Sequence, residues 1–160
     1  MPGLDEKIGS GFIKGTTTAI IGTSGTGKST FAFQYIAEGV KKGEPGIFYS
    51  LEENADWIRM MAQGYGYNIT ELENNGLAIL LGGVEDDNPD ALVANLAAEI
   101  KRTKAKRLVI DSLSAFESKY KNEMYIIARR LISLIQEHHL TAVLLFLQHR
   151  KVDLSCQGRV

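Results

Sequence analysis

The sequence predicts an α/β protein of three layers, in which a mainly parallel sheet of about five strands is covered by helices on both faces. Short, almost continuous apolar runs alternate along the chain with amphipathic segments. Strands that are apolar on both sides are typical of buried parallel sheets, and the segments between them have the pattern of crossover helices. A glycine-rich turn directly after the first apolar run is the third indication of this class.

Three of the strands are predicted in the first half of the chain, at residues 16–21, 47–51 and 77–81, because these runs are β-branched or apolar and turn-forming residues separate them. The first helix follows the first strand, and its apolar side chains recur at helical spacing: Phe33, Ile36, Ala37 and Val40. A shorter helix, with Ile58, Met61 and Ala62 inward, should end near Gly64 before a loop at residues 64–68.

The second half supplies the remaining elements in the same alternation. Pro89 suits a first helical turn after the acidic residues 85–87 and Asn88, and the buried face of that helix is marked by Leu92, Val93, Leu96 and Ile100. Strands are predicted at residues 108–110 and 142–147. The clearest helical stripe in the chain lies between them and consists of Tyr120, Met124, Ile127, Leu131 and Leu134.

Composition limits the function classes that remain open. The 160 residues are expected to form a single domain, residues 1–160, and the net charge of -1 argues against a protein that mainly coats nucleic acid. Cys156 is the only cysteine, so the chain alone cannot build a disulfide framework, and a reducing, cytoplasmic location is expected. The longest apolar run, residues 140–147, is too short to span a bilayer.

The glycine-rich turn at residues 22–29 reads Gly-Thr-Ser-Gly-Thr-Gly-Lys-Ser and fits the P-loop pattern Gly-x-x-x-x-Gly-Lys-[Ser/Thr]. Backbone N–H groups of such a loop wrap phosphates, which predicts a nucleoside triphosphate site. Lys28 would reach the β- and γ-phosphates, and Ser29 would bind Mg²⁺ at the start of the helix. A turn without a ligand needs neither this lysine nor three glycines. The candidate nucleotide-binding residues are Thr23, Ser24, Gly25, Thr26, Gly27, Lys28, Ser29 and Thr30.

Three carboxylates are candidates to complete this site. Asp111 ends an apolar strand, where an aspartate can hold Mg²⁺, although an acid there can also cap a helix or turn. Glu52 and Glu53 follow the second strand and therefore belong to the same carboxyl edge of the sheet. One of them could activate the water that attacks the γ-phosphate; alternatively, both complement the dipole of the next helix.

The ordered set of motifs resembles the KaiC-like ATPases of the RecA superfamily over nearly the whole chain. The matching features are the segment at residues 3–11 with Gly15, the P-loop, the acidic pair after residues 49–51, and Ile110-Asp111-Ser112. The resemblance implies a RecA-like P-loop fold with ATP and Mg²⁺ as ligands. It implies that Glu52, Glu53 and Lys28 are catalytic, that Ser29 and Asp111 bind the metal, and that Gln148 occupies the place of a γ-phosphate sensor.

The chain departs from the family at its end. Family domains continue through further strands, which carry basic residues that reach a neighbouring subunit's nucleotide, whereas this sequence stops at Val160 after a polar tail. The domain is therefore expected to be C-terminally incomplete and to hydrolyse ATP weakly. The implied sheet order places the first strand at an open edge, which a second copy or a partner protein is expected to cover.

Two basic segments are candidates for nucleic-acid binding. One is the run Lys101, Arg102, Lys104, Lys106 and Arg107, whose simpler interpretation is a solvated helix surface; the other is His149, Arg150 and Lys151, where the DNA-binding loops of RecA-like recombinases begin. Nucleic acid is an alternative partner and not the favoured one. The leading function is an ATPase; the alternatives are an ATP-binding signalling or scaffold module with negligible turnover and a recombinase-like DNA-binding protein.

Overall fold

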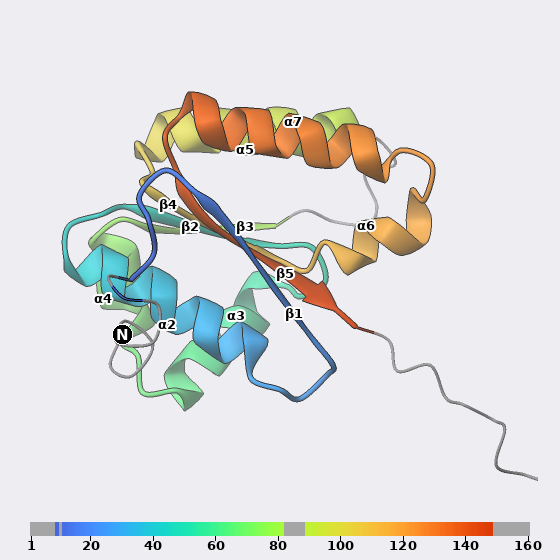
Figure 1. Cartoon of the computed structure of the whole chain (residues 1–160). Helices are drawn as coiled ribbons and strands as arrows, with labels where there is room; N and C mark the ends of the chain where they lie inside the picture. Colours follow the sequence, from blue (N-terminus) through green and yellow to red (C-terminus); the bar gives the residue numbers. More distant parts are fainter. Residues whose placement is uncertain (1–8, 10, 82–88, 149–160) are drawn as a thin grey trace, which may run out of the picture.

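The computed structural model describes residues 9, 11–81 and 89–148 of the chain (Figure 1). Several features singled out in the sequence lie outside these described residues: most of the glycine-rich segment at residues 3–11, the acidic stretch at residues 85–88, the basic residues His149, Arg150 and Lys151, and Cys156.

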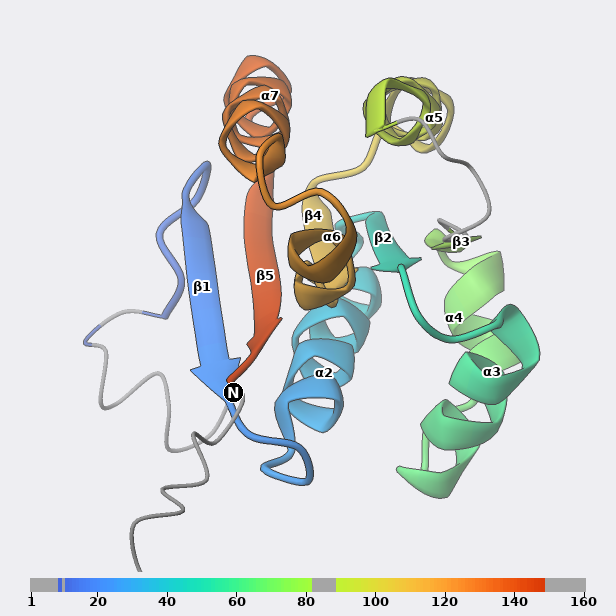
Figure 2. The ribbon, with the colours of Figure 1, turned by 90° about the vertical axis from the view of Figure 1, so that its right-hand side faces the viewer.

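Five strands form one sheet in the order β1-β5-β4-β2-β3, and every neighbouring pair is parallel. In Figure 2 the strands lie side by side in this order, from β1 at the left to β3 at the right. The predicted number and direction of strands are confirmed, and four of the five strands differ from the predicted bounds by one residue at one or both ends. The strands are β1 (Thr17–Gly22), β2 (Gly46–Ser50), β3 (Leu77–Leu81), β4 (Arg107–Asp111) and β5 (Thr141–Leu147).

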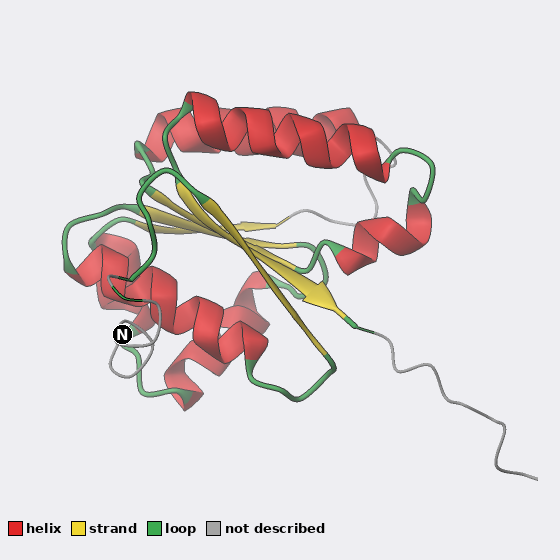
Figure 3. Ribbon diagram, viewed as in Figure 1, coloured by secondary structure: helices red, strands yellow, loops and turns green. Residues whose placement is uncertain are grey.

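Helices cover both faces of the sheet, as Figures 1 and 3 show. One face carries α2 (Lys28–Lys41), α3 (Ala55–Gly64) and α4 (Ile69–Asn74), and the other carries α5 (Pro89–Thr103) and α7 (Met124–Glu137). The short helix α6 (Ser114–Lys119) lies beyond the carboxyl end of β4. Among the described helices, none is both long enough and apolar enough to cross a membrane.

Two helices were not predicted, and one begins later than expected. Helix α4 has only six residues and is recognisable mainly by its cap, because Asn68 Oδ1 accepts a hydrogen bond from the Glu71 amide at 3.3 Å. The stripe that starts at Tyr120 is interrupted: α6 ends at Lys119, and α7 begins at Met124. Tyr120 lies between these helices and still packs against the core, which explains why it shares their apolar pattern.

Alternating side chains of the strands contribute to two hydrophobic cores. Tyr49, Ile110 and Leu144 pack with residues of α5 and α7, whereas their neighbours Phe48 and Val109 pack with residues of α2, α3 and α4. A strand that is buried on both faces loses the polar alternation of a surface strand. This explains why β2 is buried at every position.

Strand β1, one of the two edge strands of the sheet, is more exposed. Its only partner among the described strands is β5, and exposed and half-buried residues alternate along it. Ile21 is 65% exposed. The open edge implied by the family resemblance is therefore present, and β1 leads directly into the glycine-rich loop.

Candidate functional site

The loop between β1 and α2 has a backbone that only glycine adopts readily. Gly25 and Gly27 have φ values of +77° and +82°, in the left-handed region. A Cβ atom on Gly22 would lie 2.9 Å from the Thr26 hydroxyl oxygen. That hydroxyl donates to the Thr23 carbonyl oxygen at 2.8 Å, which closes the loop on itself. Side chains at these glycines would open the curve on which the P-loop prediction depends.

The same loop ends at an electropositive helix terminus. Gly27 is the N-cap of α2, and it offers no side-chain hydrogen bond to the free N–H groups of the first turn, which also contains no acidic residue. Lys28 is the first residue of the helix, and its ammonium group donates to the Thr23 carbonyl oxygen at 2.8 Å. Free N–H groups, the helix dipole and a lysine together favour an anionic ligand.

The acidic candidates converge here because β2 and β4 are neighbours. Ser50 pairs in register with Asp111, and the Leu51 amide donates to the Asp111 carbonyl oxygen at 2.7 Å, so the pairing continues one residue beyond β2. The Asp111 carboxylate shares a hydrogen bond with Ser29 in the first turn of α2. The peptide bond between Asp111 and Ser112 is cis. The two predicted metal ligands thus lie side by side.

Burial and neighbouring charges act on the carboxyl group of Asp111. Burial raises the pKa of its carboxyl group, and the hydrogen bond from Ser29 opposes this effect. The nearby Glu52 carboxylate raises the pKa of Asp111 further. A cation beside these oxygens would relieve both the burial cost and the repulsion.

Glu52 and Glu53 are both exposed, but they are held in different ways. The Ser112 hydroxyl donates to Glu52 Oε1 at 3.1 Å, whereas Ser50 binds only the backbone of Glu53, through its N–H and its carbonyl oxygen, both at 2.9 Å. The N-cap of α3 is Asn54, whose side chain accepts from the Trp57 amide. Asn54 already caps the amino end of α3, so this helix does not need either glutamate to complement its dipole.

These groups surround one cavity of about 410 Å³. Of the eleven residues predicted for the site, Thr23 alone is absent from its lining and contributes only its carbonyl oxygen to the loop. The prediction missed four lining residues: Met61, Tyr65, Ser112 and Leu147. Met61 and Tyr65 come from α3 and the turn after it, so no local motif could have connected them to the P-loop. Ser112 had a signal, since it follows Asp111 directly.

Gln148 lies beside the loop but not in the lining of the cavity. Its backbone N–H donates to the Gly22 carbonyl oxygen at 2.9 Å, so the chain leaves β5 next to the end of β1. The side chain is exposed. Its role as a γ-phosphate sensor stays a prediction.

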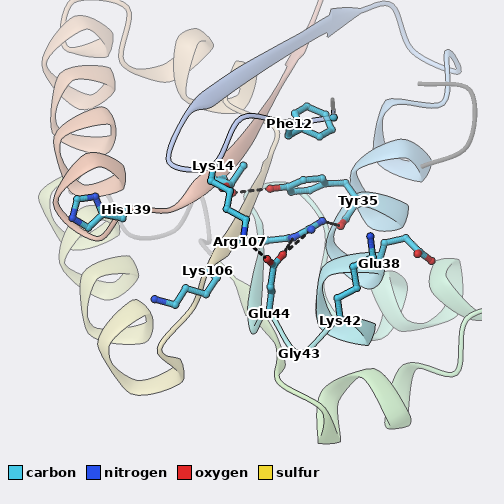
Figure 4. A pocket seen from close by; sticks show the side chains of 12 residues that line it. Phe12, Lys14, Tyr35, Glu38, Lys42, Gly43, Glu44, Lys106, Arg107 and His139 are labelled. Carbon is cyan, nitrogen blue, oxygen red and sulfur yellow. Dashed lines mark hydrogen bonds and ion pairs between the residues drawn. The ribbon is translucent and has the colours of Figure 1, made fainter. Parts of the chain in front are cut away.

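A second cavity, of about 440 Å³, lies at the opposite end of the sheet and is lined by Phe12, Tyr35 and several cations (Figure 4). Arg107 occupies its centre. Its guanidinium bonds to the Glu44 carboxylate at 2.7 Å and to the Tyr35 carbonyl oxygen at 2.7 Å, and it stacks on the Tyr35 ring. Lys14 adds a longer ion pair to Glu44. These bonds tie α2 to β4, so Arg107 is a structural residue of the fold.

The other basic residues of the run at residues 101–107 are exposed or form a local ion pair. Arg102 pairs with Glu99 at 2.5 Å, while Lys101, Lys104 and Lys106 are exposed. His138 is the C-cap residue of α7, and His139 follows it. No group of three or more His, Cys, Asp or Glu side chains within the described ranges could hold a metal ion.

A parallel sheet with helices on both faces, and a phosphate-type loop at the carboxyl end of its first strand, define a P-loop nucleotide-binding protein with a RecA-like fold. The family model described as "ATPase: KaiC" matches residues 1–154. The chain therefore belongs to the KaiC-like ATPase family. Membership implies a P-loop domain that binds ATP.

Individual relatives agree with this assignment. The circadian clock protein KaiC3 of Synechocystis sp. is 31% identical over 156 residues, which cover 90% of this chain and 31% of the relative. A UPF0273 protein of Methanopyrus kandleri is 33% identical over 130 residues, covering 71% of this chain and 52% of that protein. The chain thus spans about a third and about a half of these two relatives.

A solved structure supports the fold directly. The KaiC-like protein from the archaeon Pyrococcus horikoshii superposes with a TM-score of 0.84 at 32% identity. The superposition covers 92% of this chain and 70% of the archaeal chain. The RecA-like architecture predicted from the sequence is confirmed.

Proposed function

We propose that this chain binds Mg²⁺-ATP and hydrolyses it at the γ-phosphate, as a P-loop ATPase of the KaiC and RecA type. One observation carries the proposal: a single cavity of about 410 Å³ brings together the P-loop, Asp111 and both glutamates. A phosphate cradle, a metal ligand and a base are the groups that in-line attack by water requires. These three groups come from three separate parts of the chain: the P-loop, the end of β2 and the end of β4.

The phosphates would be held by the start of α2. Free N–H groups of the loop and of the first helical turn face the anion, and the helix dipole adds to their attraction. Lys28 now donates to the Thr23 carbonyl oxygen. It would exchange this bond for a charge-assisted bond to the β- and γ-phosphates, which is the stronger of the two interactions.

Ser29 and Asp111 fit a bound Mg²⁺. They offer a hydroxyl and a carboxylate, the hard oxygen ligands that this ion prefers, and it normally keeps several waters besides one or two protein ligands. Their shared hydrogen bond shows that the two oxygens already lie close together. When bound, the ion would neutralise charge on the phosphates.

The attacking water would be oriented and deprotonated by Glu52 or Glu53. Both follow the carboxyl end of β2 and line the same cavity as the P-loop. Carboxylates within hydrogen-bond reach of a water are competent general bases. In this proposal either glutamate would act as the base without any rearrangement of the sheet.

A partner is part of this proposal. Among the described residues, Lys28 is the only cation that lines the cavity. A positive group that stabilises the transferring phosphate can be supplied by a neighbouring molecule in P-loop enzymes. We infer that a second copy of this chain, or another protein, docks near the edge of β1 and contributes that charge.

Replacing the P-loop lysine tests the binding site. Lys28→Ala should weaken Mg²⁺-ATP binding by about 100-fold or more while the domain stays folded, because the ammonium group contributes to the ligand and not to the core. Calorimetric titration of ATP gives the Kd. Lys42→Ala, an exposed lysine at the other end of α2, is the matched control and should bind normally. Equal affinities for the Lys28→Ala and unsubstituted proteins would exclude the P-loop as the site.

Replacing the acids separates hydrolysis from binding. Glu52→Gln, Glu53→Gln and the double substitution should all preserve the Kd for ATP, and loss of the base should lower phosphate release, since an amide holds water but is a poor base. If all three variants release phosphate normally, neither acid is the base. If the unsubstituted protein binds ATP without releasing phosphate, the chain is a nucleotide-dependent signalling or scaffold module.

A further inference from the structure

Ser112 makes a contact that the sequence did not predict. It is 4% exposed, and its hydroxyl donates to Oε1 of Glu52 at 3.1 Å. Both residues line the cavity of the P-loop, although they are 60 positions apart in the chain. A buried hydroxyl therefore holds the carboxylate of an exposed residue.

The backbone on both sides of this contact is fixed. Leu51, which precedes Glu52, donates its N–H to the Asp111 carbonyl oxygen at 2.7 Å. Leu113, which follows Ser112, donates its N–H to the Leu145 carbonyl oxygen in β5 at 3.0 Å and is itself buried. The residue after Ser112 is thus bonded to β5, and the residue before Glu52 is bonded to the last residue of β4. Both hydrogen bonds fix the backbone next to the contact between Ser112 and Glu52.

Glu53 provides a comparison, because its backbone is fixed but its carboxylate has no contact of this kind. Ser50 fixes the backbone of Glu53 on both sides of the residue, at 2.9 Å each. Between described residues, no hydrogen bond or ion pair reaches its carboxylate. Two adjacent acids at one site therefore differ in one respect: only Glu52 has its carboxylate oriented by the fold.

We propose that Ser112 is a positioning residue of the ATPase site, whose hydroxyl orients Glu52 for its action on the attacking water; the inference rests on the function proposed above. Ser112 acts through Glu52 and touches neither phosphate nor water in this role. At 3.1 Å the bond is long for a hydroxyl donor, so its expected effect is one of orientation: it favours the Glu52 rotamer that reaches Ser112 over rotamers that point into solvent. Displacement of a reacting group by about 1 Å can cost roughly 100-fold in rate.

Substitutions at Ser112 should change turnover and leave nucleotide binding intact. We expect Ser112→Ala to lower kcat for phosphate release about tenfold, with the Kd for Mg²⁺-ATP changed by less than about twofold. Ser112→Cys keeps the side-chain volume with a weaker donor, so it should show the same loss even if the alanine variant folds poorly. Ser112→Thr retains the hydroxyl and should restore most of the rate.

Ser114 provides a matched control. It is also a buried serine after β4, but its hydroxyl bonds to the backbone of Leu147 and not to an acid: it accepts from the Leu147 N–H at 2.7 Å and donates to the Leu147 carbonyl oxygen at 3.5 Å. Ser114→Ala should leave both kcat and Kd unchanged. A general disturbance of the loop would instead lower kcat in both alanine variants, which would overturn the proposal.

Double substitutions identify the group through which Ser112 acts. The loss caused by Ser112→Ala should disappear in a Glu52→Gln background and multiply with Glu53→Gln. An unchanged kcat for the Ser112 variants, a parallel loss of ATP affinity, or an undiminished loss in the Glu52→Gln background would each overturn the proposal. Failure of the proposed function is distinct: the unsubstituted protein would then release no phosphate, and the inference would fall with it.

Discussion

At the scale of single residues, Asp111 carries a conflict between folding and function. Its carboxylate is the proposed ligand of Mg²⁺, but burial and the nearby Glu52 carboxylate raise its pKa. The folded protein therefore binds the proton more tightly than the unfolded chain, whose pKa is close to 3.8. Stability falls as the pH rises from that value through the raised pKa, and it stays lower above it.

Removing this charge should stabilise the protein and impair its function. In the absence of nucleotide and Mg²⁺, we expect Asp111→Asn to raise Tm at pH 7 by roughly 1–4 °C, because the amide can still accept from Ser29 without a buried charge. The difference should vanish below the ordinary aspartate pKa. Mg²⁺-dependent hydrolysis should be lost in the same variant. A lower Tm than that of the unsubstituted protein at pH 7 would contradict the assigned electrostatics.

At the scale of elements, the contact between α2 and β4 depends on a missing side chain. Gly39 is buried in α2, and a Cβ atom there would lie 2.2 Å from Cδ of Arg107. The arginine uses this space to reach Glu44 and the carbonyl oxygen of Tyr35. Helix propensity alone favours alanine over glycine by about 1 kcal/mol, so propensity and packing predict opposite signs.

We expect packing to win at this position. Gly39→Ala should lower the free energy of unfolding by about 1–2 kcal/mol, because Arg107 must leave its ion pair. In an Arg107→Ala background the same substitution should become stabilising, by up to about 1 kcal/mol. Urea denaturation measures all four proteins. Destabilisation that persists without the arginine side chain would show that another contact is responsible.

Gly64→Ala is the control for helix propensity. Gly64 is the last residue of α3, and no atom would lie within 4 Å of a Cβ placed there. Its substitution should be neutral or slightly stabilising. The contrast between two helical glycines follows from their neighbours and not from their helices.

At the scale of the whole molecule, the open edge of β1 predicts association. Ile21 is 65% exposed on this strand, and an edge strand offers unpaired backbone groups to another chain. Ile21→Lys should therefore lower the average mass measured by light scattering. Ile126→Lys, at a 52% exposed isoleucine on α7, should leave the mass unchanged. Equal effects of the two substitutions would show that general surface hydrophobicity drives association.

Turnover should depend on the same association. Because Lys28 is the only cation that the described residues place in the cavity lining, we expect phosphate release by the isolated chain to be on the order of 100-fold slower than in a P-loop ATPase whose site receives a second positive group. If a second copy supplies the missing charge, specific activity should rise with protein concentration. Full turnover by a monomer at all concentrations would contradict this expectation.

The sequence by itself determined the layers of the fold and the phosphate loop. A buried strand is recognisable from its own run of apolar side chains. The P-loop is a contiguous backbone shape that Gly25 and Gly27 permit. Both features depend on neighbours in the chain, so a local pattern suffices to predict them. Short elements such as α4 escaped because six residues carry too little periodicity.

Tertiary structure alone decided which distant residues meet. The bond between Ser29 and Asp111 and that between Ser112 and Glu52 each require the crossovers that place strand ends together. Arg107 belonged to a basic run in the sequence, yet the sheet turns it inward toward Glu44. The physical reason is that these contacts join side chains 60 or more positions apart, and their energies appear only when packing has fixed the backbones that carry them.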